Sequence, residues 1–188
     1  GIPTPSSPVG FDATFPTEAT LKQNANLGRL TITRNLFSST NTAVFTQIPV
    51  FGSRSFSIWD AATGNRVFDS GDFFEQRTAT QTPTFFNANN GSPADFDTRS
   101  DNKGPEPESV VVSLLGGNYY AFVALERAGG GVMVYDVNNP AVPNFLLYEP
   151  NAAGDVSPEG VVVIPPEQSP TGVPLLVLSN EVSGTVTI

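Results

Sequence analysis

The second half of the chain contains an internal repeat. Residues 107–112 (PESVVV) return as residues 158–163 (PEGVVV), and residues 121–126 (AFVALE) return as residues 176–181 (LVLSNE). Each copy is built of apolar runs of strand length, separated by turn residues. A period near 50 residues that holds about four strands is typical of the blades of a β-propeller.

The first half contains a weaker third copy. Residues 56–60 (FSIWD) resemble residues 132–136 (VMVYD), and in both places an aromatic–Asp pair ends a strand before a turn. We therefore expect an all-β fold, a partial β-propeller with roughly two and a half to three blades of antiparallel strands. The expected blades cover about residues 27–69, 108–149 and 158–188. A self-contained β-sandwich is the alternative.

Three segments lie outside these strands. Residues 1–15 are expected to form an extended N-terminal segment before an incomplete propeller domain over residues 16–188. The pattern around residues 16–26, with an acidic first turn and an i, i+4 apolar pair, predicts one short helix. Residues 70–107 are rich in Asp, Asn, Thr and Pro and are expected to form a long loop. Such a loop is either functional, held by an ion, or a mobile insertion.

The composition excludes several classes of function. The chain has no His and no Cys, so it cannot by itself supply a Ser-His-Asp triad, a Cys-His pair, an imidazole or thiolate zinc site, or a disulfide. The net charge of −9, from 9 basic and 18 acidic residues, argues against nucleic acid as a partner. The apolar runs have strand length, so no membrane insertion is expected.

Acidic residues recur at matching points of the repeat. Glu108 matches Glu159 before the first strand of each copy, and Glu126 matches Glu181 at the end of the second strand. In a propeller, matching residues occupy matching positions, so these four carboxylates are candidates for one rim of the channel. Ca²⁺ prefers such oxygen ligands. The alternative is a structural role, in which each Glu bonds backbone N–H groups or pairs with Arg.

Two further groups complete the candidate site residues. The long loop contains the acidic residues Asp95, Asp97 and Asp101. They are candidates for a second calcium site, and the alternative is that they belong to a polar loop exposed to solvent. The basic residues that could neutralise a bound phosphate or form ion pairs are Arg99, Lys103 and Arg127.

Several strings of the chain resemble a known family. They include LGRL at residues 27–30, GSRSFSIWD at 52–60, VFDSGD at 67–72 and DTRSDNKGPEPE at 97–108. These strings, in this order, resemble the choice-of-anchor I family of bacterial surface proteins. The chain is similar to the C-terminal portion of the family's domain. The resemblance implies a secreted or cell-surface protein with a β-propeller-like domain. Some members are labelled alkaline phosphatases.

Two function classes therefore remain. The first is an extracellular or cell-surface module for binding, adhesion or assembly, with Ca²⁺ as the candidate stabilising ion. The alternative is a metal-dependent phosphoesterase of the alkaline-phosphatase type. The alternating apolar run at residues 182–188 predicts an open strand edge with no Lys beside it. We therefore expect other copies of the chain, or remaining segments of the same protein, as partners.

Overall fold

The computed structural model describes residues 10–33, 44–52 and 54–188, and the chain divides into two compact units. The first unit comprises residues 1–52 and 100–103, and the second comprises residues 53–99 and 104–188. The expected blade over residues 27–69 has residues in both units and stays a prediction. The expected extended segment over residues 1–15 also stays a prediction, since residues 1–9 lie outside the described residues.

The first unit contains little regular structure. Its described elements are β1 (Gly10–Phe11), α1 (Glu18–Leu21) and β2 (Val44–Phe45), and β1 pairs with β2 in parallel. Its core is formed by Phe11, Ile32 and Phe45. Within the blade expected over residues 27–69, residues 27–33 form only a single antiparallel bridge, between Ile32 and Val50. Among the described residues 44–52, only β2 lies in a strand.

The helix expected at residues 16–26 is shorter than the sequence pattern indicated. It ends at Leu21 because the chain turns back on itself there. The Leu27 N–H donates to the Leu21 carbonyl oxygen, and the Gly28 N–H donates to the Gln23 carbonyl oxygen at 2.9 Å. A Cβ at Gly28 would overlap the backbone of Lys22 and Gln23, so the absence of a side chain at Gly28 permits this reversal.

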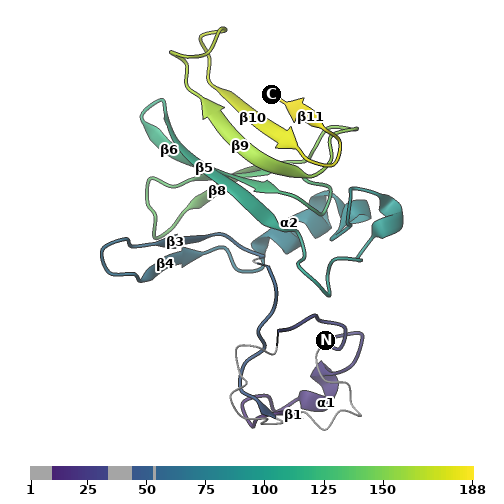
Figure 1. The fold of residues 1–188 in the computed structure, drawn as a ribbon. Coiled ribbons are helices and arrows are strands. Elements are labelled where there is room, and N and C mark those ends of the chain that lie inside the picture. Colours follow the sequence, from purple (N-terminus) through teal and green to yellow (C-terminus); the bar gives the residue numbers. More distant parts are fainter. Residues whose placement is uncertain (1–9, 34–43, 53) are drawn as a thin grey trace. The chain divides into compact units, whose positions relative to one another are not determined.

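The second unit consists mainly of small antiparallel sheets (Figure 1). The strand order of the largest sheet is β5-β6-β7-β8, that of the next is β11-β10-β9, and β3 and β4 form a hairpin. The elements are β3 (Ser57–Trp59), β4 (Arg66–Asp69), α2 (Phe73–Gln81), the 3-10 helices η1 (Pro83–Phe85) and η2 (Pro93–Asp95), β5 (Pro107–Leu115), β6 (Asn118–Leu125), β7 (Val132–Asp136), β8 (Asn144–Glu149), β9 (Pro158–Ile164), β10 (Leu175–Asn180) and β11 (Thr185–Thr187).

The prediction of an all-β fold class is confirmed. The four-stranded sheet coincides with the blade expected at residues 108–149, and the three-stranded sheet coincides with the one expected from residue 158. No sheet of the described residues closes into a barrel. This arrangement is consistent with a partial propeller and equally with the sandwich alternative.

The expectation of a long loop without regular structure over residues 70–107 was wrong. This segment contains α2, η1 and η2, so the second unit has a helix where none was expected. Phe74 of α2 is fully buried and packs against apolar residues of β6 and β7, among them Val123 and Met133. The helix is therefore held by tertiary packing rather than by an amphipathic pattern of its own.

The β5–β8 sheet is covered on both faces. On one face Ala121, Val123 and Tyr135 form a cluster with Phe56 and with α2. On the other face Ala124, Val132 and Val134 pack against apolar residues of β9 and β10, which are Val161, Leu176 and Leu178. Figure 1 shows the β9–β11 sheet stacked over β5 and β6. The candidate site lies in this unit, where β5 begins and β6 ends.

Candidate functional site: a buried cluster of glutamates and arginines

Three glutamates meet where β5 begins and β6 ends. Glu106 directly precedes β5, Glu108 is its second residue, and Glu126 directly follows β6. One carboxylate oxygen of each lies within 4.8 Å of the others. The pairing of β5 with β6 shifts register between Pro107 and Ser109. This irregularity accommodates Glu108 as an extra residue beside the other two glutamates.

Two arginines compensate part of this negative charge. Arg99 donates from Nε to Glu106 Oε1 at 3.0 Å, and its Nη2 donates to the same oxygen. Arg127 Nη2 lies 2.5 Å from Glu126 Oε1, and its Nε lies 3.6 Å from Glu106 Oε1. The side chains of Glu106 and Glu126 are only 2% and 5% exposed, so both ion pairs lie largely away from water.

The cluster brings together three glutamates and two arginines, so its acidic side chains outnumber its basic ones. Burial and, to a smaller extent, a hydrogen bond with Glu106 raise the pKa of Glu126 from 4.5 to about 7, although Arg127 opposes the shift. Near neutral pH, Glu126 is therefore protonated in part of the molecules. Glu108 is exposed, so solvent reaches the cluster from its side.

A second ion pair supports the segment that carries Arg99. Arg54 donates from Nη1 to Glu75 Oε1 on α2 at 2.6 Å, and Asn87 Nδ2 donates to the same oxygen at 2.8 Å. The backbone N–H of Arg99 donates to the Asn87 carbonyl oxygen at 2.9 Å. This chain of contacts links α2 to the Arg99 backbone and so helps to place the guanidinium that binds Glu106.

The four glutamates of the expected rim do not gather in one place. Glu108 and Glu126 do lie together, whereas Glu159 and Glu181 are exposed and lie outside this cluster. Among the described residues, the cluster around Glu106 is the only acidic group of this kind.

The second copy of the repeat forms no such glutamate cluster because two of the side chains that hold the cluster are replaced there. Position 157 of the second copy corresponds to Glu106 and is Ser, and position 182 corresponds to Arg127 and is Val. The second copy therefore lacks both the central carboxylate and the arginine that would hold its glutamates together.

The remaining predicted residues are distributed over the chain. Arg99 and Arg127 form ion pairs, the structural alternative of the two considered for them. Asp95 lies in η2, and neither it nor Asp97 belongs to the glutamate cluster. Asp101 and Lys103 belong to the first unit.

Sequence reasoning missed the central residue of the cluster. Glu106 is not marked by the repeat, because its counterpart is Ser157. The available signal was the spacing within the string PEPE at residues 105–108, which places a second glutamate two positions before Glu108. Glu75 and Arg54 carry no sequence signal of this kind.

Comparison with known proteins identifies the family. The model of the choice-of-anchor I domain matches residues 6–140 of the chain. This chain belongs to the choice-of-anchor I family. Membership confirms the resemblance found in the sequence and indicates a surface-associated protein. Among the described residues, no helix is long and apolar enough to cross a bilayer.

The chain is also similar to a curated protein. The chain is 30% identical to Gigasin-3a of Magallana gigas over 191 residues, which cover 89% of this chain and 66% of that protein. The chain thus spans slightly less than two thirds of the length of this relative. No solved structure matches the chain significantly.

Proposed function

We propose that this chain forms part of an extracellular or cell-surface module for binding, adhesion or assembly, and that Ca²⁺ stabilises it at Glu106, Glu108 and Glu126. Its family membership supports the surface location. The observation that carries the calcium proposal is the meeting of three carboxylates, within 4.8 Å of one another, at a point that solvent reaches. Oxygen ligands of this kind suit Ca²⁺.

The protonation of Glu126 gives the proposed calcium site a distinctive property. Ca²⁺ binds the ionised carboxylate, so it must displace the proton that Glu126 holds with a pKa of about 7. Binding therefore releases a proton, and the affinity for Ca²⁺ rises as the pH is raised from 6 towards 8. An ion that binds only exposed surface carboxylates would show little pH dependence in this range, because those groups are already ionised.

Thermal unfolding with and without Ca²⁺ tests this proposal. We expect Ca²⁺ to raise the melting temperature of the wild-type chain, and to do so more at pH 8 than at pH 6. The Glu108→Gln substitution should abolish the increase without removing a buried ion pair. Glu159→Gln is the matched control, because Glu159 occupies the equivalent position in the second copy and lies outside the cluster.

Two outcomes would contradict the calcium proposal. One is a melting temperature that Ca²⁺ leaves unchanged at both pH values. The other is an equal loss of the Ca²⁺ effect in Glu108→Gln and Glu159→Gln, which would place the ion elsewhere. In either case the proposal of a surface module stands separately. Release of the protein from intact cells by an external protease, or its recovery from the medium, tests that location.

The phosphoesterase alternative has its own measurement. Arg99 and Arg127, which could neutralise a phosphate, are engaged by Glu106 and Glu126. The module is therefore the better supported class. Turnover of a chromogenic phosphate ester that requires Ca²⁺ and is lost in Glu108→Gln would replace the binding module with an enzyme.

A further inference from the structure

The loop between η1 and η2 carries the only Asn-Gly pair of the chain, Asn90-Gly91. Asn90 is exposed to solvent. In such a pair the backbone nitrogen of the glycine can attack the side-chain amide carbon of the asparagine, because glycine has no side chain that obstructs the approach. Among the asparagines of the chain, Asn90 is therefore the one whose amide can most readily react with its own backbone.

The backbone around Gly91 leaves the attacking nitrogen available. The Gly91 N–H makes no hydrogen bond with any group in the part of the chain that the structure describes. Gly91 has a φ of 64°, and apart from its chain neighbours no heavy atom lies within 4 Å of the position of a Cβ. The nitrogen is thus neither held in secondary structure nor crowded by other residues.

Arg127 polarises the amide group that this nitrogen would attack. Its Nη1 donates to Asn90 Oδ1 at 2.7 Å. A guanidinium in this position draws electron density from Cγ and stabilises the negative charge that Oδ1 gains during the attack. Arg127 is held in place on its other side by Glu126, whose Oε1 lies 2.5 Å from Nη2. Within the described residues, Asn90 Nδ2 donates no hydrogen bond, so nothing there retains the leaving group.

We propose that Asn90 is a modification site at which the chain deamidates itself, with Arg127 as the activating group. The Gly91 nitrogen forms a bond to Asn90 Cγ, the bond from Cγ to Nδ2 breaks, and the proton of the Gly91 nitrogen leaves with Nδ2 as ammonia. Water then opens the cyclic succinimide at either carbonyl carbon, which leaves an aspartate or an isoaspartate at position 90. This inference goes beyond the proposed function and does not depend on Ca²⁺.

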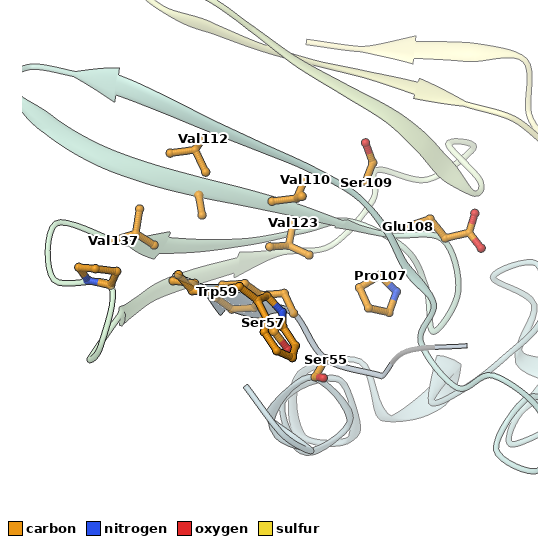
Figure 2. A pocket seen from close by; sticks show the side chains of 14 residues that line it. Ser55, Ser57, Trp59, Pro107, Glu108, Ser109, Val110, Val112, Val123 and Val137 are labelled. Atoms are coloured by element: carbon orange, nitrogen blue, oxygen red, sulfur yellow. The ribbon is translucent and has the colours of Figure 1, made fainter. Parts of the chain in front are cut away.

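The product places a new carboxylate against Arg127. The glutamate cluster opens to solvent at Glu108, whose side chain points away from the apolar residues of the neighbouring groove (Figure 2). A carboxylate at position 90 would instead meet the cluster through Arg127 Nη1, where Asn90 Oδ1 now lies. Arg127 would then be shared with a further negative charge, so the modification weakens its compensation of the buried glutamates.

Peptide mapping by mass spectrometry tests the modification on the full chain after incubation in buffer at pH 8. We expect aspartate and isoaspartate to accumulate at position 90 while Asn65, which is exposed but followed by Arg66, stays intact. Conversion of Asn90 no faster than that of Asn65 would overturn the proposal. A glycan on Asn90 would also overturn it, because the Asn-Gly-Ser triplet is a glycosylation acceptor and a glycan blocks the leaving nitrogen.

A comparison of the folded chain with the chain unfolded in urea tests the role of Arg127. Unfolding separates Arg127 from Asn90, so conversion should slow on the order of tenfold, since hydrogen bonds to charged groups are among the stronger ones. Conversion that is equally fast or faster in urea contradicts the activation by Arg127. In the folded chain, Arg127→Gln should slow the reaction and Arg99→Gln should not, because both arginines bind buried glutamates and Arg127 also contacts Asn90. The urea comparison decides the matter if either variant fails to fold.

A second pair of variants tests the attacking nitrogen. Gly91→Ala adds a methyl group beside the nitrogen and should reduce the conversion of Asn90 severalfold. Gly64→Ala is the matched control, since Gly64 has a φ of 71° and similar open space around it. Equal conversion of Asn90 in the two variants would show that the Gly91 nitrogen is not the nucleophile.

Discussion

Replacing Glu106 with Gln removes the central charge of the buried cluster while keeping nearly the same shape. Glu106 is 2% exposed and receives both Nε and Nη2 of Arg99. The Nε of Arg127 also lies 3.6 Å from it. The substitution leaves Arg99 without a carboxylate partner, and it leaves Glu126 as the one carboxylate in the cluster that pairs with Arg127. We therefore expect a loss of stability well above that of an ordinary surface substitution.

The expected size of the loss follows from the burial of the partners. Removing one member of a buried ion pair costs about 3–5 kcal/mol, because an uncompensated charge remains in the interior. Gln retains a carbonyl oxygen that accepts one hydrogen bond from Arg99, so we expect the lower end of that range. For a chain of this length, a loss of about 3 kcal/mol lowers the melting temperature by roughly 6–12 °C.

Urea unfolding followed by circular dichroism measures this change. Glu159→Gln is again the control, because Glu159 is exposed and should change the free energy of unfolding by no more than about 0.5 kcal/mol. If Glu106→Gln lowers the free energy of unfolding by less than about 1 kcal/mol, the ion pairs contribute no more than a surface pair does. That result would refute the reasoning.

Three further predictions concern the same unit. Because the folded-state pKa of Glu126 is raised from 4.5 to about 7, the folded state binds a proton more tightly, so stability should fall as the pH rises through this range; melting curves should show a shallower pH dependence in Glu126→Gln, and an unchanged slope would contradict this. Phe74→Ala should cost about 3–5 kcal/mol in urea unfolding, since Phe74 is fully buried; a cost below about 1 kcal/mol would show that α2 does not anchor the core. Gly131→Ala should lower the melting temperature, because φ is 101° and a Cβ would overlap the Glu149 carbonyl oxygen; an unchanged melting temperature would mean that this turn relaxes freely.

The parts of the fold that could be predicted are those whose signal is local. The repeated apolar runs of strand length, separated by turn residues, predicted strands within residues 107–126 and 158–181, and β5, β6, β9 and β10 lie there. The helix α2 gave no such signal. Its sequence FFEQRTATQ has two large apolar residues side by side and then only polar residues and Ala, so its position depends on the pocket that receives Phe74.

The candidate site was predictable only in part for a related reason. Glu108 and Glu126 each recur in the second copy, as Glu159 and Glu181, and the structure does place Glu108 and Glu126 together with Glu106. The extension of the same argument to Glu159 and Glu181 assumed that equivalent positions carry equivalent surroundings. The surroundings depend on Arg99 and on the register shift in β5, which no pattern of acidic residues reveals.

The backbone conformation around Glu106 recurs in the second copy of the repeat, whereas the side chains of the glutamate cluster do not. Glu106 has a φ of 49° and Ser157 a φ of 63°, so both equivalent residues adopt the left-handed conformation that non-glycine residues rarely adopt. The carbonyl oxygen of Glu106 accepts the Glu126 N–H at 2.9 Å, and that of Ser157 accepts the Glu181 N–H at 2.8 Å. The same strained turn thus joins the paired strands in both copies, whichever side chain is present. Backbone strain, which in many proteins marks a functional site, here follows from the architecture of the sheet. The two copies therefore differ at this point only in their side chains: a carboxylate with two arginines in one copy and a serine in the other.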